Sequence, residues 1–334
     1  MSYLYVNEQG ASIGISGNRI EVRHKEGMLR SIPAETLEVI QVFGNVSVTT
    51  QCLAFCLQKG IDVIYYSNNG RYYGRLISPS HVNVQRQRIQ AGINKDHAFC
   101  MDFSKKILDA KVRNQMVIIR RYARRSDYNI EPAIKEMKQN LTDIARSRTI
   151  SQLMGYEGLA ARKYFQTLGK LIIPEFSFSR RSRRPPEDAF NSMISLGYSI
   201  LFNEIYGKIE AKGLNPYFGI MHSDRNNHPA LVSDLMEEWR AVIVDSTAMS
   251  LANGHEIDIQ DFYRNEGEPG IYLAPKAFKL FVKKFDNKLR KDNKYLSYVD
   301  GDVNFRRALD LQIGIFVRSI EEKNPDLYKP VIIR

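Results

Sequence analysis

The spacing of apolar residues changes character near residue 80. Before that point, short runs rich in Val, Ile and Tyr lie between Gly, Asn and Ser turn residues, at 4–6, 19–23, 37–43, 61–66 and 72–76. Runs of this length and composition predict β-strands. Residues 50–59 are the exception, because Leu53, Ala54 and Leu57 follow helical spacing and the segment stops at Gly60. One helix is therefore expected among the strands.

After about residue 84 the apolar positions recur with the 3.6-residue period of helices. A basic helical region is expected over residues 84–124, followed by helices at 149–169, 185–213 and 229–254. The first of these three opens with Thr149 and Gln152, the spacing of a capping box, and the other two open at prolines. The predicted fold is α+β, with a small β-rich domain over residues 1–82 and a larger all-α domain over residues 83–334.

Positive charge is concentrated in one stretch of the chain. The whole sequence has 48 Lys and Arg against 37 Asp and Glu, a net charge of +11. Residues 81–184 contain 22 basic and 9 acidic residues, a surplus of +13, so the remainder sums to −2 (11 − 13). Such a surplus attracts a polyanion, and nucleic acid is the obvious candidate. The alternative is that these arginines form solvated faces of amphipathic helices.

Composition excludes several classes of protein. With 334 residues, 43% of them apolar, the chain can bury a sizeable core. Its first ten residues show no secretory signal, and its apolar runs are far shorter than the roughly 18–20 residues that span a membrane. Three cysteines without a C-x-x-C pair predict neither a disulfide framework nor a zinc site, and Cys52 and Cys56 are expected in the core. A cytoplasmic protein without a membrane partner is expected.

One histidine and two carboxylates suggest metal chemistry. His222 ends the segment Gly219-Ile220-Met221-His222, and Asp234 and Glu237 follow at helical i, i+3 spacing, which places both acids on one side of a helix. Mg²⁺ and Mn²⁺ prefer oxygen ligands, and Mn²⁺ also accepts imidazole. Beside a basic surface, such a set suits metal-assisted phosphodiester chemistry.

The helical wheel complicates this assignment. Leu231, Leu235 and Trp239 define an apolar stripe that places Glu237 roughly opposite it and Glu238 beside it. On periodicity alone Glu237 is a solvated carboxylate, and the choice between the two glutamates stays open.

Two further segments carry candidate residues. Glu157 is the single acid in 155–165, a helix otherwise lined by Ala, Leu and aromatic residues. A lone carboxylate on an apolar face needs a cation or a hydrogen-bond donor; alternatively, Glu157 pairs with Arg162 or Lys163 at the surface. The basic segment 180–184 then leads through Pro185-Pro186 into the next helix and is expected either to contact DNA phosphates or to brace that helix.

These features, in this order, resemble the Cas-one family, the integrase of CRISPR spacer acquisition. The resemblance rests on G-x-E-G-x-A-A at Glu157, R-R-P-P-x-D-x-x-N ending at Asn191, G-x-x-H at His222 and D-L-x-E-x-W-R from Asp234 to Arg240. The order of a β-rich and an α-helical domain and the total length agree with it. The match spans essentially the whole chain.

The resemblance implies a catalytic site. Family members bind Mn²⁺ or Mg²⁺ through residues that correspond to Glu157, His222 and Glu237, which favours Glu237 over Glu238. Asp234 corresponds to an acid that supports catalysis or a second ion. No other cofactor is implied. The residues expected to contact DNA are Arg162, Lys163, Arg180, Arg181, Arg183 and Arg184.

The implied reaction is transesterification. The 3′-hydroxyl of a short DNA fragment attacks a phosphodiester at the leader–repeat boundary of a CRISPR array, and water in place of that hydroxyl gives endonuclease activity. Family members form homodimers through the β domain, and two dimers assemble on a small protein of the Cas-two family to carry double-stranded DNA to the array. Two alternatives stay open: a branched-DNA repair nuclease with the same site, and a non-catalytic DNA-binding scaffold.

Overall fold

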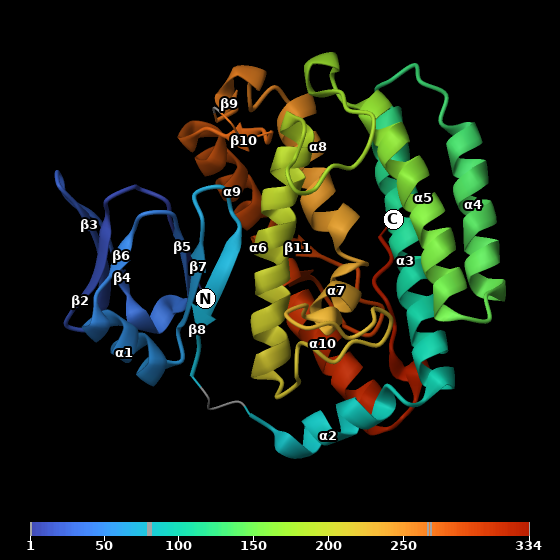
Figure 1. Ribbon diagram of the computed structural model, residues 1–334, viewed down its shortest axis with the longest axis horizontal. Coiled ribbons are helices and arrows are strands. Elements are labelled where there is room, and N and C mark those ends of the chain that lie inside the picture. Colours follow the sequence, from blue (N-terminus) through green and yellow to red (C-terminus); the bar gives the residue numbers. More distant parts are fainter. Residues whose placement is uncertain (1, 79–81, 266, 268, 334) are drawn as a thin grey trace. The chain divides into compact units, whose positions relative to one another are not determined.

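The computed structural model of the chain describes residues 2–78, 82–265, 267 and 269–333. The chain divides into two compact units, Met1–His81 and Val82–Arg334. The first contains two four-stranded sheets, and the second is built mainly of helices (Figure 1). The α+β class expected from the sequence is confirmed. The division between the units lies one residue before the expected one.

The two sheets of the first unit differ in topology. One has the order β1-β5-β7-β8, in which β1, β5 and β7 are parallel and β8 is antiparallel to β7. The other has the order β4-β3-β2-β6, in which only β6 is parallel to its neighbour. Their bounds are β1 (Ser2–Val6), β2 (Ser12–Ser16), β3 (Arg19–His24), β4 (Gly27–Pro33), β5 (Leu37–Phe43), β6 (Ser47–Val48), β7 (Asp62–Tyr66) and β8 (Tyr72–Leu76).

All five predicted strands are present, as β1, β3, β5, β7 and β8, whereas β2, β4 and β6 were not predicted. Strand β4 lies at a sheet edge with its first four residues exposed, so it has no buried face to produce an alternating pattern. Strand β6 is only two residues long. The edge strands β1 and β8 were nevertheless predicted, and the missed β2 lies inside its sheet, so position in the sheet alone does not decide which strands the pattern reveals.

The predicted helix of the first unit is α1 (Thr50–Lys59). The Thr49 side chain accepts a hydrogen bond from the Cys52 backbone N–H, and Gly60 ends the helix with φ 70° in the left-handed region that glycine adopts most easily. Cys52 and Cys56 share one face and are fully buried in the hydrophobic core, as predicted.

Nine helices lie in the described part of the second unit. They are α2 (Val84–Ile93), α3 (His97–Ala123), α4 (Glu131–Arg146), α5 (Ile150–Leu171), α6 (Ala189–Ala211), α7 (Ala230–Met236), α8 (Ser246–Asn253), α9 (Pro275–Arg290) and α10 (Phe305–Glu321). Four two-residue strands form two small ladders, β9 (Phe262–Tyr263) with β10 (Tyr272–Leu273) and β11 (Asp292–Asn293) with β12 (Val303–Asn304).

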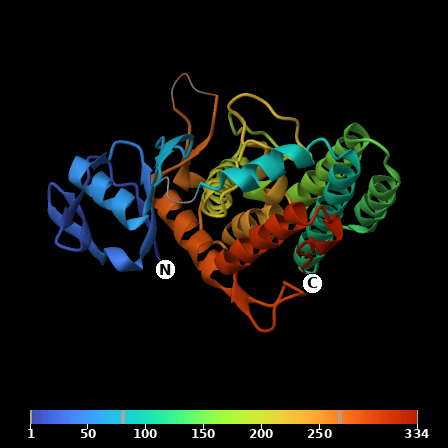
Figure 2. The same cartoon turned by 90° about the horizontal axis from the view of Figure 1, so that it is seen from below.

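Two groups of helices build this unit. Helices α3, α4 and α5 pack against one another, and α10 packs against α2, α6 and α9 (Figures 1 and 2). The Phe103 ring on α3 lies 5.2 Å from that of Phe316 on α10 and 4.6 Å from that of Tyr328, centroid to centroid. Aromatic side chains therefore join α3 to the last helix and the segment after it. No helix in the described ranges is long and apolar enough to cross a membrane.

The helix predicted over residues 229–254 is not one regular helix. It consists of α7, a π-helical turn η4 (Arg240–Asp245) and α8. A π-turn changes the angular position of the residues that follow it, so a wheel with a uniform 3.6-residue period does not describe them. In addition, every residue from 230 to 239 is buried, so this segment has no solvent-facing side. The wheel-based expectation that Glu237 is solvated was wrong for this reason.

Helix α6 approaches η4 and α9 closely at Gly197. A Cβ atom there would lie 2.5 Å from Val244 Cγ1 and 2.9 Å from Phe281 Cζ, whereas one at Gly314 on α10 would have no neighbour within 4 Å. We expect Gly197→Ala to lower the free energy of unfolding by about 1–3 kcal/mol through overpacking. Gly314→Ala should raise it by about 0.5–1 kcal/mol, the helix-propensity gain. Urea unfolding of both variants measures this, and equal effects would contradict the close approach.

Candidate active site

Two glutamates distant in sequence meet at one lysine. Lys111 Nζ, on α3, lies 2.5 Å from Glu157 Oε1 on α5 and 2.5 Å from Glu237 Oε2, just after α7. The three side chains are 9%, 14% and 8% exposed, respectively. Helix α3 packs against both α5 and η4, which brings the two acids to the same ammonium group.

Ion pairing opposes the effect of burial on the pKa values of Lys111 and Glu237. Burial by itself would lower the pKa of Lys111, but the Glu157 and Glu237 carboxylates raise it above its ordinary value. Burial would likewise raise the pKa of Glu237, but the Arg240 guanidinium and the Lys111 ammonium lower it to about 2. Arg240 Nε lies 3.0 Å from Glu237 Oε2. The buried Glu237 carboxylate is therefore ionised, because two cations compensate its charge.

Asp234 holds the loop that carries His222. Its Oδ2 accepts hydrogen bonds from the backbone N–H groups of Ile220 and Met221, at 2.6 and 3.0 Å. Its Oδ1 accepts from the His222 backbone N–H at 3.0 Å and lies 2.5 Å from His222 Nδ1. Since a carboxylate has about four lone-pair sites, these contacts occupy them all. Asp234 therefore positions His222, and its contacts leave no free lone pair for the second ion that the resemblance allowed.

The contact between Asp234 and His222 Nδ1 determines which imidazole nitrogen is available to bind a ligand. An ionised Asp234 only accepts, so His222 Nδ1–H donates to it and the Nε2 lone pair of a neutral ring is left for a ligand. Burial would lower the pKa of His222, but the bond to Asp234 raises it overall. Gly219 permits the close approach, because a Cβ there would lie 2.6 Å from Ala230 Cβ and 2.8 Å from the His222 carbonyl oxygen.

The two adjacent glutamates have different partners. Glu238 is fully buried and accepts hydrogen bonds from Tyr328 O–H at 2.7 Å and from the Val331 backbone N–H at 2.8 Å. Burial raises its pKa to about 7. Glu238 thus anchors the C-terminal segment, whereas Glu237 forms ion pairs with Lys111 and Arg240. This geometry agrees with the choice of Glu237 that the resemblance favoured.

A buried network fixes Arg240. Its guanidinium lies 4.9 Å from the centroid of the Tyr198 ring, and Tyr198 O–H donates to Asp245 Oδ1 at 2.5 Å. Tyr164 O–H donates to the other oxygen of Asp245 at 2.9 Å. Arg240 and Asp245 begin and end the π-helical turn. The turn therefore directs Arg240 toward Glu237, while Asp245 holds the Tyr198 ring on which Arg240 stacks.

The basic residues expected to contact DNA do not share one environment. Arg183, Arg184 and Arg162 are exposed. Arg180 is exposed and paired with Glu187 at 3.1 Å, and Lys163 is paired with Glu136 at 2.6 Å.

Arg181 differs from its neighbours in the loop. It is mostly buried, donates to Asn191 Oδ1 at 2.9 Å and Ser195 Oγ at 3.1 Å, and lies 5.3 Å from the Tyr198 ring centroid. These are the contacts of a residue that braces α6, the alternative that the sequence had left open.

The donor set fits a hard divalent cation. Within the described ranges no three His, Cys, Asp or Glu side chains form a metal-binding group, and Lys111 lies between Glu157 and Glu237. Glu237 Oε2 is nevertheless buried without a partner of hydrogen-bond geometry. An oxygen ligand lies about 2.0–2.1 Å from Mg²⁺. The 2.5 Å contacts to Lys111 Nζ show that the two carboxylates approach one cation almost that closely.

Sequence reasoning missed Lys111, Tyr198, Arg240 and Asp245. For Lys111 a signal exists: Ile107, Lys111, Asn114 and Ile118 follow helical spacing on α3, so a cation interrupts an apolar stripe. Among 22 basic residues in the same stretch this signal is weak. The contact between Tyr198 on α6 and Asp245 depends on the π-helical turn that carries Asp245, and the sequence pattern did not predict that turn.

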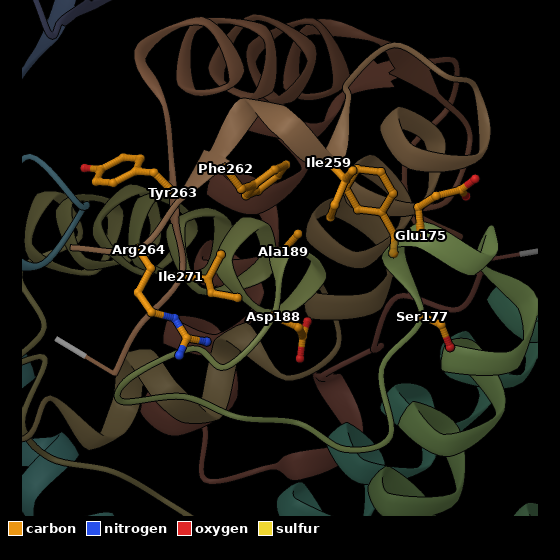
Figure 3. A pocket seen from close by; sticks show the side chains of 10 residues that line it. Glu175, Ser177, Asp188, Ala189, Ile259, Phe262, Tyr263, Arg264 and Ile271 are labelled. Carbon is orange, nitrogen blue, oxygen red and sulfur yellow. The ribbon is translucent and has the colours of Figure 1, made fainter. Parts of the chain in front are cut away.

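A separate pocket of about 380 Å³ lies between η3 (Pro174–Phe176), the start of α6 and the β9–β10 ladder (Figure 3). Phe176 and Phe262 supply apolar walls, and Asp188 and Arg264 supply polar groups. Its lining includes neither a residue of the carboxylate cluster nor one of the predicted catalytic residues.

The Asp245 network predicts a pH dependence of stability. Burial raises the pKa of Asp245 to about 6 against its ordinary 3.8, although hydrogen bonds from Tyr198 and Tyr164 oppose this rise. The folded chain therefore binds this proton more tightly than the unfolded chain. The associated stability is complete below pH 4 and is lost as the pH rises to 6, a loss of about 3 kcal/mol.

Asp245→Asn should remove this loss, so the wild-type chain should lose about 3 kcal/mol relative to the variant between pH 4 and pH 7. Urea unfolding at each pH measures the difference. The control Asp127→Asn, in an exposed loop, should keep the wild-type profile. Parallel profiles for Asp245→Asn and the wild type would contradict the assignment.

Comparisons with known proteins identify the family. The family model described as "CRISPR associated protein Cas1" matches residues 4–287. A CRISPR-associated endonuclease Cas1 of Mycobacterium tuberculosis is 37% identical over 325 residues, which cover 97% of this chain and 96% of the relative.

Two solved structures share the fold. A casposase bound to an integration product has a TM-score of 0.88 at 22% identity and covers 100% of this chain and 95% of its own. A Cas6-RT-Cas1–Cas2 complex has a TM-score of 0.84 at 24% identity and covers 98% of this chain and 36% of that longer one. The chain therefore belongs to the Cas1 family, which is the Cas-one family that its motifs resemble, and this prediction is confirmed.

Proposed function

We propose that this chain is a divalent-metal-dependent DNA integrase and endonuclease of CRISPR spacer acquisition. The observation that carries the proposal is the convergence of Glu157 and Glu237 on one buried cation position. Beside them lies an imidazole whose Nε2 lone pair is left free by the clamp on Nδ1. The Mycobacterium tuberculosis relative is named an endonuclease, and the casposase of the same fold is bound to an integration product.

Glu157, Glu237 and the Nε2 atom of His222 would hold Mn²⁺ or Mg²⁺. When bound, this ion supplies a Lewis acid that offsets charge on the phosphoryl group and lowers the pKa of an attacking hydroxyl. The surrounding residues have structural tasks: Asp234 keeps Nε2 of His222 aimed at the ion, and Arg240 keeps Glu237 ionised. Arg183 and Arg184, exposed on the loop before α6, would hold the DNA backbone.

The reaction conserves phosphodiester bonds. The O–H bond of a 3′-hydroxyl breaks, its oxygen forms a new P–O bond at the leader–repeat boundary, and the P–O bond of the target strand breaks to release a 3′-hydroxyl that takes up a proton. One phosphodiester is formed for each one broken, so no external energy source is required. With water as the nucleophile, the same groups give hydrolysis and hence endonuclease activity.

Partners follow from the same proposal. The chain would act on double-stranded DNA as a cytoplasmic protein, together with a Cas-two family protein, a pairing supported by the complex of Cas1 and Cas2 that shares its fold. It would form a homodimer through the first unit. The edge strand β4 of that unit exposes Met28 and Leu29, 57% and 45%, which suits a surface that a second chain covers.

One experiment separates this proposal from its two rivals. The chain is incubated with a 3′-hydroxyl DNA fragment, a plasmid that carries a CRISPR array, Mn²⁺ and a Cas-two protein. Joined product supports the integrase, and cutting without joining supports a repair nuclease. DNA binding without reaction, unaffected by EDTA and by Glu157→Gln, would indicate a non-catalytic scaffold.

Substitution of the three proposed ligands tests the site directly. Glu157→Gln, His222→Ala and Glu237→Gln should each lower strand transfer about 100-fold or more, since even outer partners of metal ligands cost 10–100-fold. Glu322→Gln serves as the control, because Glu322 is exposed and pairs with Arg318 on the surface. Circular dichroism verifies folding. A folded Glu157→Gln variant with full activity would refute the proposal.

The basic loop offers a paired test of DNA binding. Arg183→Ala/Arg184→Ala should weaken DNA binding regardless of sequence and reduce the slope of log K against log salt by about 1 for each lost phosphate contact. Arg181→Ala should instead lower stability, because its guanidinium holds Asn191 and Ser195. Fluorescence anisotropy over a salt series measures the slopes. An unchanged slope in the double variant would exclude this loop from the DNA interface.

A further inference from the structure

Lys111 lies where the proposed function requires a metal ion. Its ammonium nitrogen is 2.5 Å from an oxygen of Glu157 and 2.5 Å from an oxygen of Glu237, and a magnesium ion would lie about 2.0–2.1 Å from the same kind of oxygen. The two cations cannot share this position. Metal binding and the Lys111 contacts are therefore mutually exclusive.

The charge of the cluster leads to the same conclusion. Two carboxylates, Glu157 and Glu237, face two cations, Lys111 and Arg240, so the group is balanced as it stands. A divalent ion added to this balanced and largely buried group would leave two uncompensated positive charges, which is costly in a medium of low dielectric constant. One of the two cations must move away.

The structure distinguishes the two cations. Arg240 stacks on Tyr198, and Asp245 holds that ring in place by a hydrogen bond. Lys111 has a flexible four-carbon stem, and within the described residues its ion pairs are with the two carboxylates that would bind the metal ion. Lys111 is thus the cation that can leave.

We propose that Lys111 is an exchangeable internal counter-ion: it holds Glu157 and Glu237 together in the metal-free protein and is displaced from them when Mn²⁺ or Mg²⁺ binds. The inference rests on the proposed function, because it assumes that these two carboxylates are the ligands. It adds a positioning residue that preforms the site. The length of the lysine side chain limits how far the displaced ammonium can move. The metal-loaded site therefore has more positive charge than the metal-free site, and this charge favours binding of a phosphodiester.

Removal of the competing charge provides the test. Lys111→Met keeps a long apolar side chain but cannot compete with the ion, so we expect its Kd for Mn²⁺, measured by titration calorimetry, to fall about tenfold or more. Its metal-free melting temperature should fall, and Mn²⁺ should raise it by more than it does in the wild type. Lys106 lies on the same helix and pairs with the exposed Asp326, so Lys106→Met should match the wild type in both measurements.

A second measurement requires no variant. Acetylation of the wild-type chain by a soluble amine reagent, read by peptide mass spectrometry, should leave Lys111 protected without metal and label it after Mn²⁺ is added, whereas Lys106 should react in both states. Protection of Lys111 while calorimetry shows bound Mn²⁺ would overturn the inference, even if Lys111→Met did not fold.

The outcomes separate this inference from the function on which it rests. If the wild type binds Mn²⁺ and Lys111→Met binds it equally or more weakly, the counter-ion role is wrong and the metal-dependent integrase stands. If neither protein binds Mn²⁺, the counter-ion role and the metal-dependent integrase are both wrong. If Lys111→Met binds Mn²⁺ more tightly than the wild type, the counter-ion role is supported.

Discussion

The structure of the second unit depends on the burial of two like charges beside one another. Glu157 and Glu237 approach a single nitrogen to 2.5 Å each, and neither is more than 14% exposed. Two desolvated carboxylates at this distance repel strongly unless a cation lies between them. Helices α3, α5 and α7 are therefore held to an arrangement that brings Lys111 to both acids. The same two carboxylates are the ligands that the proposed function assigns to a hard divalent ion.

The surrounding polar groups keep this position rigid. Asp234 uses four hydrogen-bond contacts to hold the loop of His222, and Asp245 accepts from two tyrosines, one of which carries Arg240 on its ring. Such networks are stable in a core only when every member is satisfied. The π-helical turn contributes to this network, because it begins at Arg240, which contacts Glu237 and Tyr198, and ends at Asp245, which accepts a hydrogen bond from Tyr198. π-turns are often found at functional sites.

This arrangement suits strand transfer on DNA. A site that must bind an ion and then a phosphodiester needs paired carboxylates without a permanent excess of negative charge. Under the proposed function, the Lys111 ammonium would balance those acids until the ion binds, and the exposed Arg183 and Arg184 on the loop before α6 would meet the DNA backbone. Arg181, in contrast, belongs to the scaffold through Asn191 and Ser195, so the loop has both a structural and an exposed part.

The sequence by itself determined the local structure, because capping residues, turn glycines and hydrophobic periods act over a few residues. The helices opening at Thr149 and closing at Gly60, five of the eight described strands of the first unit and the family motifs at Glu157 and His222 could all be read in this way. Only the tertiary structure decided which charges meet. Glu237 seemed solvated on a regular helical wheel, yet its helix is buried on every side and gives way to a π-turn. Lys111 is one of many basic residues in sequence. It becomes distinctive only when packing removes water from it and leaves two carboxylates as its neighbours.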